Sequence, residues 1–298
     1  MTVSWVDIAR KDFEDAARSR MLWGFIAVFV AFLAMSLPVA EQLFPDAVAV
    51  TPTKALSGVA MLAQLFVPGI ALVAAYMAIV GERRSGSLRM LLSYPFSRRD
   101  VVAGKLGGRL LVTVTALTIG YAVASVLVVV LYGLPDPAAF AGFVGAGVLL
   151  GVTFTGIAIG GSAAASSRGR AMTLTIGSFV GMVFFWKPVA AGLYHAITGS
   201  LPGLHADRWY FLLKRLNPLE AFRALTSAAL GQEVSAVPRF PVEDLPAYAS
   251  PGQPDLATRL VGEVPFYLQD WFSVVVLVAW GVCPVLLGYW RFERADLG

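Results

Sequence analysis

The chain has 298 residues, of which 57% are hydrophobic and only 14% charged, about half the usual charged share of a soluble domain. Its formal net charge of +4 needs no nucleic-acid partner, because membrane proteins concentrate Lys and Arg on cytoplasmic loops. The single cysteine, Cys283, excludes an internal disulfide. Repeated uncharged runs of about 20 residues, each long enough to cross a bilayer, predict an all-α membrane protein with several spans.

Residues 1–20 precede the first apolar run and are predicted to form an N-terminal elbow helix in the headgroup plane. Trp5, Ala9, Phe13 and Ala16 fall near one helical face, and the charged residues lie elsewhere. An ordinary polar lead-in is the alternative interpretation. A signal peptide is disfavoured, because the apolar run is too long and no small-x-small cleavage site follows it.

Six spans are predicted from the apolar runs that charges and turn residues separate. In chain order they cover residues 21–40, 55–80, 110–134, 139–164, 171–197 and 271–290. A basic segment, residues 81–109, lies between the second and third spans. A long outer loop, residues 198–270, lies between the fifth and sixth.

The distribution of Lys and Arg predicts the orientation of the chain. With the N-terminus inside, the inner segments carry 15 of these residues, and the two short outer loops carry one, Lys54. The long outer loop holds six more, but loops beyond about 60 residues contribute little to orientation. Both termini and the basic segment are therefore predicted to be cytoplasmic.

The outer loop is predicted to begin with helices that lie at the interface or re-enter the bilayer, because residues 209–213 place aromatic and aliphatic bulk beside two basic residues. Asn217-Pro218-Leu219-Glu220 predicts an N-cap, a proline at the first helical position and a capping-box acid at the third. This helix is expected to end at Gly231. The prolines between residues 234 and 265 disfavour regular structure there.

The sequence contains little that supports enzymatic activity. Gly104-Lys105 resembles the end of a phosphate-binding P-loop, but Leu106 replaces the Ser or Thr that would hold magnesium, and Arg99 stands where the first glycine belongs. The two histidines, His195 and His205, have no cysteine or acidic cluster nearby at metal-ligand spacing. We therefore expect no metal site, no cofactor and no enzymatic activity in the chain itself.

Lys187 is the one ionisable residue inside a predicted span, where a charge is costly. It lies 16 residues after Ala171, about 24 Å along a helix, and so near the outer surface. A lysine there can extend its ammonium group to the headgroups. The alternative is a side chain that lines a transport path.

Glycines recur at four-residue spacing in the fourth and fifth predicted spans. The pairs are Gly147 and Gly151, Gly156 and Gly160, and Gly177 and Gly181. Such pairs permit close contact between helices, either within one chain or between two subunits.

The basic segment 81–109 carries seven of the 23 Lys and Arg residues. A positive-inside loop accounts for that charge, but the segment is longer than a tight turn requires. Within it, Leu88, Leu91 and Leu92 form an apolar stripe on a short helix that ends at Tyr94-Pro95. Leucines at helical spacing on an aqueous loop favour contact with a groove of a partner protein.

The next helix is expected to begin behind this stripe, since Ser97 and Asp100 can cap it. The whole segment resembles the signature of ABC transporter type 2 permeases, which have an acid, Gly-Thr-Leu, Leu-Leu-Ser-x-Pro, Ser-Arg and Gly-Lys in this order after the second span. The matching residues are Glu82, Gly86, Ser87, Leu88, Leu91, Leu92, Pro95, Arg98 and Lys105. Ser87 stands in place of the usual threonine.

The resemblance extends to the elbow helix, the six spans and the outer hairpin. A second motif is similar to one in the subgroup that includes permeases linked to nitrous oxide reductase maturation and many archaeal relatives. Its residues are Asn217, Pro218, Glu220 and Arg223.

The resemblance implies the permease subunit of an ATP-driven ABC transporter, with export as the predicted direction, in the plasma membrane of a prokaryote. A separate cytosolic ABC ATPase subunit would bind the ATP, and residues 82–95 would hold the coupling helix that sits in a groove of that ATPase. Two copies of the chain would form the pore. The implied partners are thus the ATPase, a second copy, the lipid bilayer and an extracytoplasmic accessory protein.

Two alternative hypotheses are carried beside this one. The first is a non-transporting anchor that recruits a cytosolic ATPase to the membrane. The second is a membrane enzyme whose outer loop supplies His205, Asp207 and Glu220. The apolar spans suit lipids, hydrophobic drugs or peptides as substrates.

Overall fold

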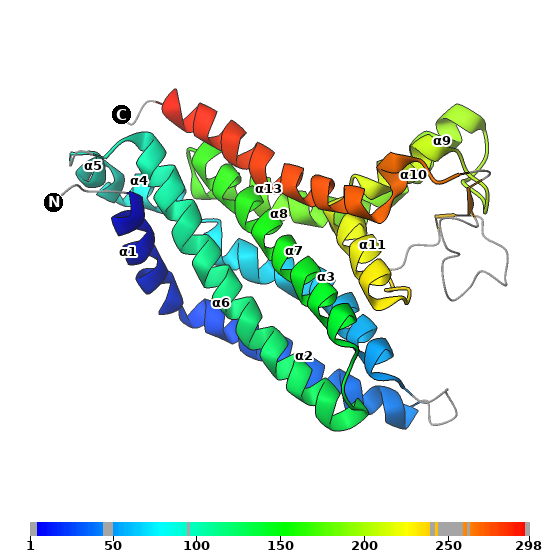
Figure 1. Ribbon diagram of the computed structural model, residues 1–298. Coiled ribbons are helices and arrows are strands. Elements are labelled where there is room, and N and C mark those ends of the chain that lie inside the picture. The colour runs from blue at the N-terminus through cyan, green and yellow to red at the C-terminus, as the bar shows by residue number, and fades with distance from the viewer. Residues whose placement is uncertain are drawn as a thin grey trace.

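The computed structural model describes residues 5–43, 50–93, 96–238, 242–243, 259–260 and 263–295, without the side chains of residues 36–43, 89 and 92. Within these ranges the chain is helical and contains no strand. Long helices run side by side between two ends of the molecule (Figure 1). We call the end that carries α1, α4 and α5 the terminal end, and the end that carries α9, α10 and α11 the distal end.

The chain enters the bundle through a bent pair of helices. α1 (Trp5–Ala17) is amphipathic and turns its buried face, which includes Ile8 and Asp12, toward the bundle. α2 (Arg20–Leu43) follows at an angle of 60°. This bend gives the elbow that the sequence predicts at the N-terminus.

The next helices contain the basic segment. α3 (Pro52–Ala75) is followed by the two short helices α4 (Val80–Ser85) and α5 (Ser87–Leu92), and then by α6 (Arg98–Tyr132). The predicted cap at Ser97 is confirmed, because the Ser97 hydroxyl accepts from the Asp100 amide at 3.1 Å and the Asp100 carboxylate accepts from the Ser97 amide at 2.9 Å. Since α6 begins at Arg98, residues 98–109 of the basic segment are the first turns of a long helix.

The second half of the bundle begins with α7 (Pro137–Ala164). α8 (Arg168–Val180), a π-helical turn (Gly181–Phe185) and α9 (Trp186–Thr198) then form one continuous apolar segment. The π-helical turn ends at Phe185, one turn before Pro188, which has no amide hydrogen to donate into the preceding turn.

The outer region contributes α10 (Arg208–Arg215), α11 (Pro218–Leu230) and a short 3-10 turn (Phe266–Leu268), and α13 (Asp270–Glu293) returns to the terminal end. The predicted bounds of α11 are confirmed: Asn217 caps its start, and Gly231 ends it with a φ of 60°. Because α11 packs against α3, α7 and α13, it lies between the long helices as a re-entrant element (Figure 1).

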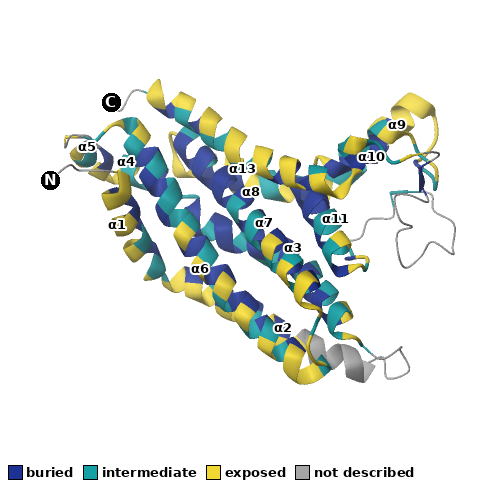
Figure 2. Cartoon of the chain, viewed as in Figure 1, coloured by how far each residue is buried: buried dark blue, intermediate teal, exposed yellow. Residues whose placement is uncertain are grey.

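The predicted class of fold is confirmed in the described part of the chain. Five segments are long and apolar enough to cross a membrane, and the bent pair of α1 and α2 makes a sixth if it counts as one span. The five are residues 52–85, 98–132, 137–164, 168–198 and 270–293. Buried residues line their facing sides, and the outer faces of α2 and α13 are largely exposed (Figure 2).

Most of the paired glycines serve contacts inside this chain. A Cβ at Gly156 would lie 2.0 Å from the Gly281 carbonyl oxygen, and one at Gly160 would lie 2.2 Å from that of Pro284, so α7 and α13 touch backbone to backbone. Gly147 and Gly151 face side chains of α6. Only the third pair differs: a Cβ at Gly177 would meet one side chain of its own helix, and one at Gly181 would meet nothing within 4 Å.

Candidate functional site

Two of the signature residues, Glu82 and Lys105, meet at the terminal end, where α1 crosses the start of α6. The crossing is close because two glycines of α6 have no side chain. A Cβ at Gly104 would lie 2.6 Å from the Ile8 Cβ, and one at Gly108 would lie 2.7 Å from the Ala9 carbonyl oxygen. Each of these glycines is followed by a basic residue, so the same approach brings α1 against Lys105 and Arg109.

Four charged side chains meet at this crossing, and we call them the terminal charge network: Asp12, Glu82, Lys105 and Arg109. The Lys105 ammonium lies 2.6 Å from one Asp12 oxygen and also pairs with Glu82 of α4. The Arg109 guanidinium lies 2.6 Å from the other Asp12 oxygen and donates to the Ala74 carbonyl at the end of α3. The network therefore joins α1, α3, α4 and α6.

The terminal charge network contains two acids and two bases and is largely buried. The side chain of Asp12 is 2% exposed and that of Lys105 is 7% exposed. A buried charge that loses its partner costs about 3–5 kcal/mol, whereas an intact set need not stabilise the fold more than apolar packing would. The network thus fixes the positions of α1 and α4 against α6. The Lys105 ammonium already binds two carboxylates, those of Asp12 and Glu82.

The base of α4 is held by a side chain from α7. α3 ends at Ala75, and the amides of Ile79 and Val80 both donate to the Ser162 hydroxyl at 3.1 Å. These amides belong to the unwound junction between two helices and would otherwise be unsatisfied. Ser162 therefore fixes the root of α4 to the bundle, and Glu82 then fixes it to α6.

α4 and α5 meet in a bend at Gly86, which has a φ of 78° that favours glycine. The Ser85 and Ser87 hydroxyls lie 2.7 Å apart across this bend, and both reach the Glu82 carbonyl. Residues 84–87 are exposed. The bend therefore projects from the terminal end as a short helical hairpin (Figure 1).

The predicted leucine stripe needs a correction, because it faces inward where the structure describes it. Leu88 is 1% exposed and belongs to the main apolar core, and Leu91 packs partly against the same core. The Leu92 side chain and Pro95 lie outside the described residues. Among the side chains of α5 that the structure describes, Met90 is apolar and 67% exposed. Leu88 thus supports the bend from within, and Met90 is presented to the surroundings.

Arg98 binds the end of another helix of the same chain. Its guanidinium donates to the carbonyls of Phe292, Glu293 and Ala295 at 2.6, 2.9 and 2.9 Å. A cation there satisfies free carbonyls and complements the negative end of the dipole of α13. Arg98 therefore ties the start of α6 to the end of α13.

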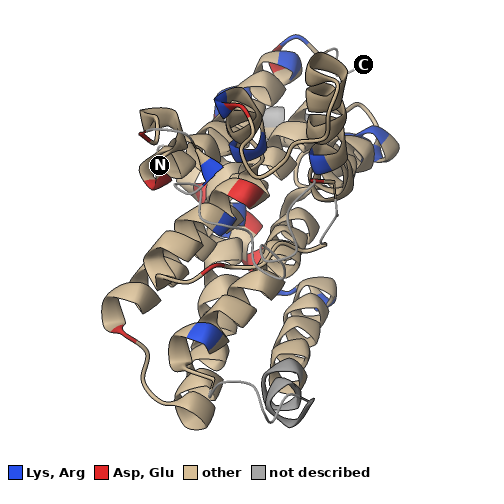
Figure 3. Cartoon of the chain, turned by 90° about the vertical axis from the view of Figure 1, so that its right-hand side faces the viewer, with Lys and Arg blue, Asp and Glu red and all other residues tan. Residues whose placement is uncertain are grey.

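A second group of charges lies at the distal end (Figure 3). The Lys187 ammonium lies 2.7 Å from one Glu220 oxygen, and Arg223 donates to the other oxygen at 2.8 and 3.1 Å. The Lys187 side chain is 12% exposed. Its ammonium group therefore ends on a carboxylate of α11. Glu220 accepts from these two side chains, whereas the sequence predicts that it caps the backbone of α11.

The subgroup motif also joins α11 to the π-helical turn. The Asn217 side chain accepts from the Leu219 amide at 2.9 Å as an N-cap, and it donates to the Met182 carbonyl at 2.8 Å. Pro218 occupies the first turn of α11, where no amide is needed. Asn217 and Glu220 thus hold the re-entrant helix against the fifth span, and Arg223 holds Glu220 in place.

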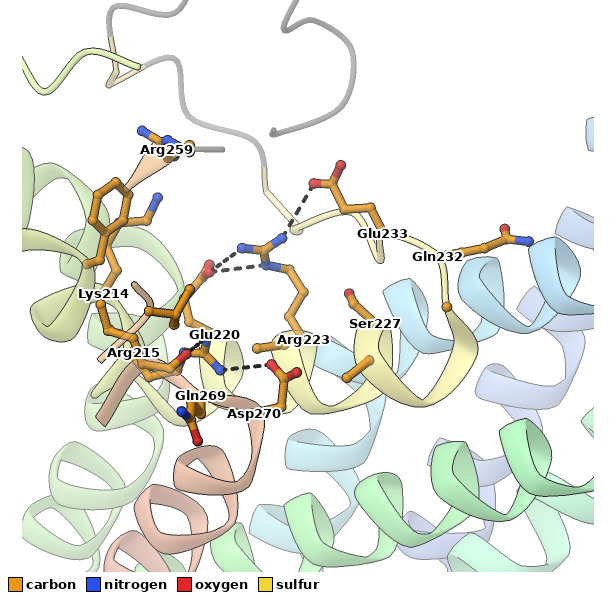
Figure 4. Close-up of a pocket in the computed structure, with 16 residues that line it drawn as sticks. Lys214, Arg215, Glu220, Arg223, Ser227, Gln232, Glu233, Arg259, Gln269 and Asp270 are labelled. Carbon is orange, nitrogen blue, oxygen red and sulfur yellow. Dashed lines mark hydrogen bonds and ion pairs between the residues drawn. The ribbon is translucent and has the colours of Figure 1, made fainter. Parts of the chain in front are cut away.

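A cavity of about 670 Å³ opens beside this group (Figure 4). Its wall includes Lys214 and Arg259, which both pair with Glu243, a residue that also accepts from the Tyr210 hydroxyl at 2.8 Å. Burial alone would raise the pKa of the Glu243 carboxyl, but the charges of Lys214 and Arg259 outweigh it and hold that pKa below its usual value. The acids and bases around the cavity therefore satisfy one another.

The three residues of the enzyme hypothesis have separate surroundings. His205 lies 3.4 Å from the Arg259 carbonyl, and Asp207 is exposed at the start of α10. Glu220 is held by Lys187 and Arg223. Over the ranges that the structure describes, no group of three or more His, Cys, Asp or Glu side chains could hold a metal ion.

Two members of the terminal charge network were missed by the sequence analysis as site residues. Asp12 was noted only as a charge away from the apolar face of α1, and Arg109 only as part of the basic segment. The available signal was the pair Gly104-Lys105 and Gly108-Arg109, four residues apart. Such spacing on a helix puts both glycines on one face for a close crossing.

The fold and the site define a multi-pass helical membrane protein in which ion pairs hold a short helical hairpin at one end. The family model for the ABC-2 family transporter protein matches residues 6–297, and the chain belongs to this family. It is 31% identical over 252 residues to the probable ABC transporter permease protein NosY of Pseudomonas aeruginosa, covering 81% of this chain and 90% of that protein. The protein of the same name from Stutzerimonas stutzeri is 29% identical over 242 residues, covering 78% and 84%.

The chain is therefore the permease subunit of an ABC transporter. Such a subunit implies an ATPase as its partner. The terminal charge network and the group of charges at the distal end are therefore features of a permease.

Proposed function

We propose that the chain is the membrane half of an exporter in which the α4–α5 hairpin receives the movement of a cytosolic ATPase. The observation that carries this proposal is the terminal charge network. Through Lys105, it links Glu82 of the hairpin to Asp12 of α1 and to the start of α6. A displacement of the hairpin would therefore move α1, which leads into α2, and the start of α6, which is itself a span.

The exposed face of the hairpin has the chemistry of a docking surface. Arg84, Ser85 and Ser87 surround the bend, and Met90 adds an exposed apolar side chain. A short helix with such a mixture suits a groove on a partner protein. Leu88 supports the hairpin underneath, so the surface keeps its shape when a partner pulls on it.

The proposed orientation places the terminal end in the cytoplasm. The support is the excess of Lys and Arg in the segments that belong to this end. A cytosolic ATPase would then meet the hairpin, and α9, α10 and α11 would lie on the outer side. We further propose that two copies form the pore, with the open space at Gly181 available to a neighbour.

Reversing the exposed chemistry of the hairpin should weaken ATPase binding. We expect Arg84→Glu with Met90→Asp to lower the affinity of the purified permease for its ATPase by roughly thirtyfold, because loss of a central contact costs about 2 kcal/mol or more. The control is Lys11→Glu with Arg18→Glu, two exposed residues of the same end. Unfolding midpoints should match in both variants, and equal ATPase affinity in both would exclude the hairpin as the contact.

A non-transporting anchor would bind the ATPase but would not need to move. We expect a spin label at Ser200→Cys, in a Cys283→Ser background, to report an intermolecular distance that shifts by several ångströms when ATP and a hydrolysis-inactive ATPase are added together. Both positions are exposed. ATP without the ATPase should have no effect. A distance that stays fixed would favour the anchor, and the absence of any intermolecular distance would contradict the homodimer.

A further inference from the structure

A second cavity lies at the terminal end, away from the terminal charge network. Its volume is about 1070 Å³, and it is formed by the turn between α7 and α8, the end of α13 and one residue of α4. Four of its lining residues are arginines: Arg83, Arg170, Arg291 and Arg294. Among the residues that the structure describes, none that lines this cavity is Asp or Glu. The cavity is therefore a concentration of positive charge.

Three of these arginines, Arg170, Arg291 and Arg294, have no acidic partner among the residues that the structure describes. Arg170 donates to the Ser166 hydroxyl at 2.9 Å, and the Arg294 guanidinium lies 4.4 Å from the centre of the Trp290 ring. Within the described ranges, neither these two residues nor Arg291 forms an ion pair with a carboxylate. Guanidinium groups with free donors match the paired oxygens of a phosphate group.

The start of α8 adds further donors for an anion. Ser167 caps this helix, and its hydroxyl accepts from the Arg170 amide at 3.4 Å. The first amides of a helix have no partner within it, and the helix dipole is positive at this end. The start of α8 lines the cavity through Gly169 and Arg170, so a phosphate in the cavity would meet backbone amides as well as arginines.

The remaining walls are apolar and continue along two spans. Leu174 of α8 and Trp290 of α13 line the cavity, and both are exposed. Leu286 and Leu287, one turn before Trp290, are also exposed. Tryptophan is enriched at the level of the headgroups, and apolar side chains beyond it face acyl chains. The positive charge of the cavity is therefore next to an apolar surface, an arrangement that matches the charged headgroup and the acyl chains of a phospholipid.

We propose that this cavity binds the phosphate headgroup of an anionic phospholipid, with the acyl chains along the exposed faces of α8 and α13. Basic pockets between membrane helices are suited to such headgroups. A cytosolic protein would meet the exposed hairpin of α4 and α5, whereas the apolar walls of this cavity, Leu174 and Trp290, belong to α8 and α13. The lipid would thus contact α8 and α13 at the same end of the molecule that carries the terminal charge network.

The test measures binding of phosphatidylglycerol to the purified full-length chain in detergent. Native mass spectrometry should retain one phosphatidylglycerol per chain in preference to phosphatidylcholine, and the lipid should raise the unfolding midpoint. Arg170→Gln with Arg291→Gln should weaken binding roughly thirtyfold, since each arginine near a membrane surface contributes about a fivefold factor. The matched control, Arg168→Gln with Arg18→Gln, removes two exposed arginines of the same end that do not line the cavity and should bind as the native chain does.

Several outcomes would overturn the proposal. Equal loss in the two double variants would mean general attraction of basic residues for acidic lipid. Equal protection by inorganic phosphate would mean that a soluble anion, not a lipid, is the ligand. Displacement of the lipid on addition of the ATPase, or on dimerisation followed by light scattering, would assign the cavity to a protein interface. Lipid binding is compared only between variants whose unfolding midpoint without lipid equals that of the native chain. If Arg170→Gln with Arg291→Gln unfolds, Arg291→Gln alone is measured in its place.

Discussion

Replacing Asp12 by Asn is expected to lower the free energy of unfolding by about 3–5 kcal/mol, the usual cost of removing one partner from a buried set of charges. The Asp12 side chain is 2% exposed; Lys105 contacts one of its oxygens, and Arg109 contacts both. Without the charge of Asp12, Lys105 keeps only Glu82 as an acidic partner among the described residues, and Arg109 loses its carboxylate partner. Thermal or denaturant unfolding of the purified chain in detergent measures this loss.

The control for Asp12 is Asp15→Asn, the same chemical change at an exposed position of α1. We expect this control to change stability by less than about 0.5 kcal/mol. Adding Lys105→Met to Asp12→Asn removes one acid and one base together, so it should recover part of the loss, with a coupling free energy of about 1–3 kcal/mol. Equal unfolding of Asp12→Asn and Asp15→Asn would show that the terminal charge network does not hold α1 on α6.

Gly160→Ala is expected to destabilise the bundle by about 3 kcal/mol, the upper part of the range for added atoms in a packed interior. The new Cβ would lie 2.2 Å from the Pro284 carbonyl oxygen, and backbone cannot rotate away as a side chain can. α7 and α13 would have to separate along their contact. The unfolding midpoint in detergent should fall by roughly 5–10 °C.

Gly145→Ala is the matched control, because it lies on the same helix and a Cβ there would meet nothing within 4 Å. Alanine is the better helix former by about 0.5–1 kcal/mol, so this variant should be as stable as the native chain or slightly more so. If the unfolding midpoints of Gly160→Ala and Gly145→Ala fall by the same amount, the loss of stability comes from the glycine content of α7 and not from its contact with α13.

Local pattern was sufficient for several features of this chain. Ser97 with Asp100, and Asn217 with Pro218, predicted the starts of α6 and α11, because capping depends on residues within one turn. The elbow and the re-entrant element also followed from amphipathic runs. α6 begins before residue 110, where the predicted span starts, because a basic, polar run can be helical when another helix packs against it.

The charge networks depended on contacts that no local pattern encodes. Lys187 was expected at the headgroups or on a transport path, but the partner that holds it, Glu220, lies 33 residues away on the re-entrant helix. Leu88 was expected on the surface, yet the bend at Gly86 turns it into the core. Side-chain direction at a bend follows from the backbone angles there, and sequence spacing does not specify them.

The sequence by itself determined the class of protein, because spans, caps and the excess of Lys and Arg are properties of single segments. It also identified the signature of residues 82–105 as a unit. Only the tertiary structure decided what this unit contacts: Lys105 and Arg109 meet Asp12, Arg98 meets the end of α13, and Met90 rather than Leu88 faces outward. The physical reason is that a buried charge must find its partner in space, and that partner lies on whichever helix the packing brings within reach.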